Sequence, residues 1–167
     1  MSVRVAVRID YVEFDYVSGG LRVTVDGVPL VRYDGDEGNE YLEYLLDTTL
    51  SNVLRSLETV VREGAAATAK AEGSVLEVSL TPAGDGRTRI ALRGTESIHP
   101  ASRRGYVVET EALCEEVITC ARKVAWACEA DAAAIDWPDG LAEFDRSGED
   151  HFLRERVASL RRALRSE

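Results

Sequence analysis

The chain has 167 residues, 45% of them apolar and 7% aromatic, so it is long enough for one hydrophobic core and short for two. Thirty acidic against twenty basic residues give a net charge of −10, which disfavours nucleic acid and anionic membranes and favours a partner with a basic surface. No segment has the apolar run of a signal peptide or membrane span, so we expect a single-domain cytoplasmic protein over residues 1–167. Scarce lysine beside abundant alanine, valine and glycine indicates GC-rich coding and suggests a bacterial origin.

Residues 1–33 are predicted to be rich in strands. Apolar side chains alternate at every second position over 3–9, and the alternation changes phase near Tyr11, which predicts a bulge or a tight bend there. Further along, Asp26 and Gly27 predict the turn of a hairpin. Its second strand contains Pro29, which has no backbone N–H to donate, and this strand is therefore expected at a sheet edge.

The longest predicted helix spans residues 39–63 and ends at Gly64. Its apolar residues recur at helical spacing and form one stripe: Leu42, Leu46, Leu50, Val53, Leu54, Leu57, Val60 and Val61. The alanine-rich segment 65–72 suits either a continuation of this helix or a linker. Residues 74–94 alternate on both sides of a turn sequence and predict a second hairpin.

Residues 111–165 are predicted to be mostly helical, after an irregular loop and a short strand over 106–109. Strands first, then a helix, a hairpin and further helices predict an α+β fold. In this fold an N-terminal strand and two hairpins form a mostly antiparallel sheet, with about three helices packed on one face. A β-α-β crossover around the 39–63 helix would instead give a mixed sheet.

Three cysteines, Cys114, Cys120 and Cys128, lie on one predicted helix. A rise of ~1.5 Å per residue places Cys120 about 9 Å and Cys128 about 21 Å from Cys114 along the axis, too far for a disulfide or a shared metal. All three fall on the apolar side of the helix. We therefore expect them to pack in the core as small hydrophobic residues.

The acidic sequence at 34–41, DGDEGNEY, resembles a calcium loop only at its start. Counting from Asp34, an EF-hand would need a ligand at Gly38, a glycine at Asn39 and a glutamate at Leu45, and all three requirements fail. Acidic residues before a helix are explained by the helix dipole. The sequence predicts no metal site.

Residues typical of catalysis are scarce. His99 and His151 are the only histidines, and neither belongs to a recognisable nucleophile, phosphate-binding or metal motif. We therefore predict a non-enzymatic protein without a cofactor. An enzyme or ligand-binding domain remains the alternative if a deep pocket gathers one of these histidines with carboxylates or arginines.

Two segments are candidates for binding a partner. Opposite the apolar stripe of the 39–63 helix lie two tyrosines among acids, where aromatic rings would supply contact area and carboxylates would steer a basic partner: Glu40, Tyr41, Tyr44 and Asp47. The second segment, between Glu129 and Asp150, has eight carboxylates against Arg146 alone. It also carries Trp137 and Phe144, next to Asp145.

These observations favour a small acidic module that binds and occludes another protein, as an immunity or inhibitor protein would. A structural or adaptor subunit of a larger assembly is the second hypothesis. Arginines at strand and helix positions also leave a homodimer open: Arg87, Arg89, Arg93, Arg103, Arg104, Arg154, Arg156, Arg161, Arg162 and Arg165.

Overall fold

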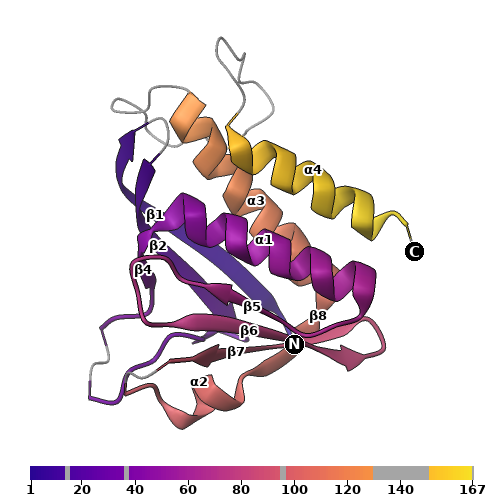
Figure 1. The fold of residues 1–167 in the computed structure, drawn as a ribbon. Helices are drawn as coiled ribbons and strands as arrows, with labels where there is room; N and C mark the ends of the chain where they lie inside the picture. Colours follow the sequence, from indigo (N-terminus) through magenta and orange to yellow (C-terminus); the bar gives the residue numbers. More distant parts are fainter. Residues whose placement is uncertain (14–15, 36–37, 95–96, 130–150, 167) are drawn as a thin grey trace.

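The computed structural model describes residues 1–13, 16–35, 38–94, 97–129 and 151–166. This part of the chain forms two four-stranded sheets and four helices, with the three long helices in a layer over the sheets (Figure 1). Every strand pair is antiparallel. The predicted α+β fold with antiparallel strands is therefore confirmed and the mixed-sheet alternative is wrong, although the strands are divided between two sheets.

The first sheet is built around β2 (Tyr16–Val25). On one side β2 pairs with β1 (Val3–Glu13), and on the other side it pairs with β3 (Val28–Pro29) and β4 (Leu42–Leu45) along different parts of its length. Since β3 pairs only with β2, Pro29 lies at a sheet edge as expected.

The predicted phase change in β1 is a register shift between Ile9 and Tyr11. Before the shift Ile9 pairs with Gly19, which lies on the same face of β2 as the buried Val17 and Leu21. After it Tyr11 pairs with Ser18. Because paired residues share a face of the sheet, the bulge moves Tyr11 to the outer face, away from Ile9.

The second sheet has the order β5-β6-β7-β8. Its strands are β5 (Ala67–Lys70), β6 (Glu77–Gly84), β7 (Arg87–Arg93) and β8 (Tyr106–Glu109), with the short helix α2 (Pro100–Arg104) between the last two. The hairpin predicted at 74–94 and the short strand at 106–109 are confirmed. The alanine-rich segment after Gly64 is neither helix nor linker, because β5 pairs with β6.

The long helices are α1 (Leu46–Glu63), α3 (Thr110–Glu129) and α4 (Phe152–Leu164). The prediction that a helix begins at residue 39 is wrong, because 42–45 pair with β2 as a strand. Leu42 and Leu46 are both buried, so an apolar pattern continues across the change from strand to helix. Gly64 ends α1 in a left-handed conformation, as its position suggested.

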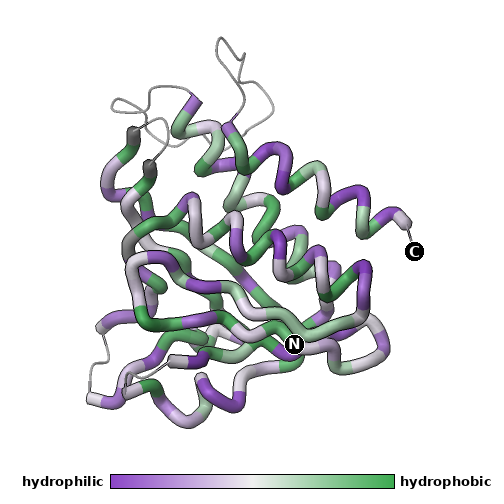
Figure 2. Tube along the Cα trace, viewed as in Figure 1, coloured by the Kyte–Doolittle hydropathy of each residue, from purple (hydrophilic) through white to green (hydrophobic). Residues whose placement is uncertain are grey.

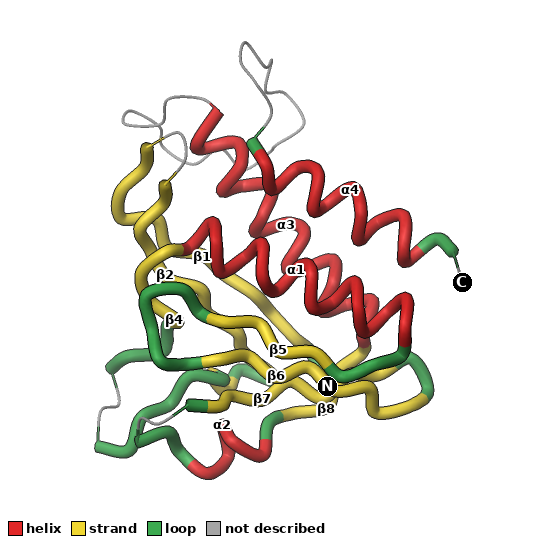
Figure 3. Tube along the Cα trace, viewed as in Figure 1, coloured by secondary structure: helices red, strands yellow, loops and turns green. Residues whose placement is uncertain are grey.

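One hydrophobic cluster includes residues of the long helices and of both sheets. Figure 3 shows these helices lying over the strands. Leu21 and Leu80 from the two sheets and Leu57, Leu113 and Leu160 from the helices are at most 1% exposed. Figure 2 shows hydrophobic and hydrophilic residues alternating along the helices, as their packing on the sheets requires. No helix in the described ranges has the length and hydropathy needed to cross a membrane.

Candidate functional site

The outer face of the first sheet is the surface on which two of the predicted partner-binding residues, Glu40 and Tyr41, lie. Strand alternation puts Val5 and Val23 in the core, and the long helices pack on that side. The intervening residues of β1 and β2 point the other way. We call this surface the sheet-1 face and define it by Arg8, Tyr11, Arg22, Glu40, Tyr41 and Glu43.

Tyr41 lies flat on this face because Gly20 has no side chain. A Cβ added at Gly20 would stand 2.8 Å from Cδ1 of Tyr41, so only glycine leaves room for the ring. The guanidinium of Arg8 lies over the same ring, 4.7 Å from its centroid. The backbone of Gly20 on one side and the guanidinium of Arg8 on the other fix the orientation of the Tyr41 ring.

Three ion pairs hold the charged residues around this ring. Arg8 contacts Asp10 at 2.9 Å and Glu43 at 2.5 Å, and Arg22 contacts Glu40 at 2.5 Å. Hydrogen bonds to Asp10 and then to Glu43 raise the pKa of Arg8 above its ordinary value. The pairs are about one-third to one-half exposed, so they contribute little to stability and chiefly position the side chains.

Tyr11 adds a second ring to the sheet-1 face. Its side chain is 54% exposed, whereas Val3 and Val5 of the same strand are buried. Such exposure is unusual for a large aromatic side chain. The bulge after Ile9 gives it this direction. Exposed aromatic rings are enriched in protein-binding surfaces.

A groove of about 910 Å³ adjoins the sheet-1 face at Glu40. Its apolar part comes from β3 and the segment after it, and its polar part from the segment between β3 and β4 and from the start of α2. The lining residues include Val28, Pro29, Val31, Arg32, Tyr33, Asp34, Asn39, Glu40 and His99. Tyr33, one of the lining residues, forms a β-bridge with Ile98. The groove and the sheet-1 face thus share Glu40 and form one continuous surface.

The structure brings together only part of the predicted partner site. Glu40 and Tyr41 lie on the sheet-1 face, but Asp47 is 1% exposed and cannot contact a partner. The reason is the late start of α1, which turns Asp47 inward where it accepts the backbone N–H of Val17 at 3.3 Å. The side chain of Tyr44, and all of Trp137, Phe144 and Asp145, lie outside the described residues.

Asp47 instead belongs to a buried polar cluster that joins the ends of the three long helices. Glu129 binds the guanidinium of Arg154 with both oxygens, at 2.5–2.9 Å, and also accepts the backbone N–H of His151 at 2.9 Å. Burial raises the pKa of Asp47 and lowers that of His151, so each is shifted towards its neutral form. The sequence offered no signal for this cluster, because its members are far apart along the chain.

Both histidines cap helices. Nδ1 of His99 accepts the N–H of Ala101 at 3.1 Å at the start of α2, and Nδ1 of His151 accepts the N–H of Leu153 at 3.3 Å at the start of α4. In this role the ring nitrogen is an acceptor and the neutral ring carries its proton on Nε2. His99 lines a groove with two carboxylates, those of Asp34 and Glu40.

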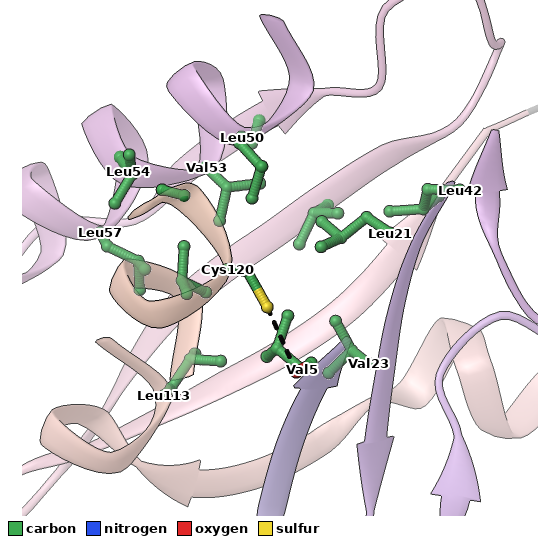
Figure 4. Close-up of a cluster of buried hydrophobic side chains, with 14 of the residues drawn as sticks. Val5, Leu21, Val23, Leu42, Leu50, Val53, Leu54, Leu57, Leu113 and Cys120 are labelled. Carbon is green, nitrogen blue, oxygen red and sulfur yellow. Dashed lines mark hydrogen bonds between the residues drawn. The ribbon is translucent and has the colours of Figure 1, made fainter. Parts of the chain in front are cut away.

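The cysteines are buried in the core, as predicted. The thiol of Cys120 donates to the backbone carbonyl of Val5 at 3.3 Å (Figure 4). Burial raises the pKa of Cys120 and of Cys128 to about 12. A thiol that stays protonated at neutral pH is a poor nucleophile.

Comparison with known proteins finds no match to this chain among family models, curated proteins or solved structures. Among the residues that the structure places, no three His, Cys, Asp or Glu side chains form a metal-binding group. Sequence reasoning missed Arg8, Gly20 and Glu43 as parts of the site. Two adjacent glycines within an alternating strand were the available signal, since they indicate that something lies close to the backbone.

Proposed function

We propose that this chain is a protein-binding module that docks a partner with a basic surface on the sheet-1 face and the adjoining groove. Occluding a partner in the manner of an immunity or inhibitor protein is the activity that such a surface fits best. The observation that carries the proposal is the fixed ring of Tyr41, held between Gly20 and Arg8. A ring that is already ordered loses little entropy on binding, and such rings are frequent binding hot spots.

The charge of the surrounding segment supports a basic partner. From residue 34 to residue 43 the sequence has five acidic residues and no basic one. Asp34 is exposed and Glu40 and Glu43 are half-buried on the sheet-1 face and at its groove. Carboxylates around an aromatic anchor speed the approach of a cationic surface and reject anionic ones.

The adaptor and enzyme alternatives differ in what they require. An adaptor subunit would copurify in a stable assembly, whereas an inhibitor would bind one enzyme and abolish its activity. The enzyme alternative is supported by the groove, which brings His99 near Asp34, Glu40 and Arg32. However, no hydrogen bond in the described residues joins the His99 ring to a carboxylate, an arrangement that a general base normally has.

Affinity purification from the native host, with mass spectrometry, would identify candidate partners, and calorimetry would then test them. We expect Tyr41→Ala to weaken binding of the true partner at least about tenfold, as loss of an aromatic hot spot does. Phe152→Ala is the control, because Phe152 is a 43% exposed ring on α4, in the helical layer. If every identified partner binds Tyr41→Ala as tightly as the unmodified chain, the sheet-1 face is not the binding surface.

A further inference from the structure

A second charged surface lies on the outer face of the second sheet, and nothing in the proposed function uses it. On the core side of β7, Thr88, Ile90 and Leu92 are buried. On the other side Arg87, Arg89 and Arg93 are exposed, while Ala91 between the last two is 7% exposed. Helix α2 packs against the same strand (Figure 1) and adds two more arginines, Arg103 and Arg104. We call this surface the arginine face; its cations, all exposed, are Lys70, Arg87, Arg89, Arg93, Arg103 and Arg104.

Backbone contacts hold several of these side chains in place. Arg89 Nη1 donates to the carbonyl of Arg104 at 3.1 Å, and Arg103 Nη1 donates to the carbonyl of Gly94 at 3.3 Å. A guanidinium has five N–H donors, so one bond to a carbonyl leaves donors for a second ligand. The arginines are thus oriented by the protein's own backbone.

Acidic residues balance the arginine face only in part. Glu77, Asp85 and Glu109 lie opposite or beside its cations, and among the described residues Arg87 forms an ion pair with Asp85, at 3.4 Å. Within the described ranges, Arg89, Arg93 and Arg104 form no ion pair. The chain has a net charge of −10. Counted over the described residues alone, this surface still has six cations and three carboxylates.

We propose that the arginine face binds an extended acidic segment of another protein. Arg87 and Arg89 are two residues apart on a strand, so they are separated by about 6.6 Å, the spacing of alternate side chains in an extended peptide. Carboxylates at alternate positions would therefore meet successive guanidinium groups, which bind carboxylates through two parallel hydrogen bonds.

Two observations favour a polypeptide over a nucleic acid. No aromatic side chain is present among the described residues that form this surface, so bases would have nothing to stack on. Nucleic acid also carries charge at a much higher density than an acidic peptide, and the net charge of the chain opposes it more strongly. The arginine face is formed by residues other than those of the sheet-1 face, so the two proposals stand or fall separately.

The test is a titration, followed by NMR, with a synthetic peptide that alternates glutamate with serine and is long enough to span β7. We expect shift changes confined to β7 and α2, and binding that weakens as salt is added. Arg89→Glu with Arg93→Glu should weaken binding at least about fivefold, because two attractive contacts become repulsive. The matched control is Arg161→Glu with Arg162→Glu on α4, which should bind like the unmodified chain.

Three results would overturn this proposal. The first is no detectable binding of the acidic peptide, and the second is equal weakening by the α4 control, which would mean that only the total charge matters. The third is tighter binding of a single-stranded oligonucleotide of equal length, which would assign the surface to nucleic acid. None of these results bears on binding through Tyr41.

Discussion

The backbone amide of Val5 donates to Oε2 of Glu116 over 2.9 Å, so a side chain of α3 closes the outer edge of β1. The carbonyl of Val5 accepts a hydrogen bond from the thiol of Cys120, which lies on the same helix. An open strand edge is a template for pairing with other chains. Here α3 both covers the sheet and bonds the amide and carbonyl of Val5 at its edge.

This contact predicts a specific loss of stability. Glu116→Ala leaves the amide of Val5 without its acceptor in a partly buried position, and we expect the free energy of unfolding to fall by about 1–3 kcal/mol. The adjacent Glu115 is exposed, so Glu115→Ala should change stability little. Urea denaturation of both variants measures the difference, and equal effects would contradict the role given to Glu116.

The pair of Glu129 and Arg154 should be the most sensitive polar contact in the protein. Their side chains are 2% and 16% exposed, and Glu129→Gln leaves the guanidinium without its counter-charge. Breaking a buried pair from one side typically costs about 3–5 kcal/mol, and we expect a loss near the lower end because Arg154 retains some solvent contact. Asp85→Asn, at an exposed pair with Arg87, should leave the urea midpoint unchanged.

Stability should depend on pH through His151. Burial lowers the pKa of His151 below its ordinary value of 6.5, so the folded protein binds fewer protons there than the unfolded chain. Its contribution to stability is therefore complete above 6.5 and is lost as the pH falls below this value. Protonation would also place a hydrogen on Nδ1, where Leu153 N–H now donates.

The measurement compares the unmodified chain with His151→Asn, which keeps an acceptor for the helix cap but does not titrate. Between about pH 7 and about pH 5 the urea midpoint of the unmodified chain should fall further than that of the variant. The raised pKa of Asp47 acts with the opposite sign, since its contribution is lost as the pH rises from 3.8, but it is present in both proteins. Parallel pH curves would contradict the prediction.

The two adjacent glycines of β2 should differ in their tolerance of a side chain. A Cβ at Gly19 would stand 2.0 Å from the backbone carbonyl oxygen of Arg8, which cannot move without breaking the pairing of β1 with β2. At Gly20 the obstacle is the side chain of Tyr41, which can move. We expect Gly19→Ala to unfold the chain, and Gly20→Ala to fold, by circular dichroism, but to bind the partner as weakly as Tyr41→Ala.

The cysteines should be unreactive in the folded state. All three are at most 4% exposed, and the pKa of two of them is raised to about 12. Labelling with a thiol reagent at neutral pH should therefore be slow in buffer and complete in urea. Fast labelling of one thiol in buffer would show that one of these helix positions is accessible.

The sequence predicted those features that depend on local periodicity. Alternation over 3–9 and its phase change located the bulge near Tyr11, and helical spacing of the cysteines placed them in the core. The division of the strands between two sheets depends on pairings distant in sequence, which periodicity does not report. Segment 65–72 was ambiguous because alanine suits helices, and pairing with β6 decided the outcome in favour of a strand.

The candidate site was predicted only at Glu40 and Tyr41, and for a reason that was partly wrong. A helical wheel begun at residue 39 placed Asp47 beside them, whereas strand β4 ends before Asp47 and α1 then turns it inward. Arg8 and Gly20 come from other strands, so their contact with Tyr41 required the sheet register. Residues that come together from different strands have no regular spacing along the chain, so a single sequence gives no pattern by which to find them.

The use of both histidines as helix caps gives the protein two separate internal reporters. The chain has only two imidazole rings, so each gives its own nitrogen signals in NMR, and those signals depend on which ring nitrogen holds the hydrogen. The ring of His99 responds when α2 opens and that of His151 when α4 opens. In protein labelled with nitrogen-15, and without any attached probe, an experimenter can thus follow whether α2 or α4 loosens first as denaturant is added.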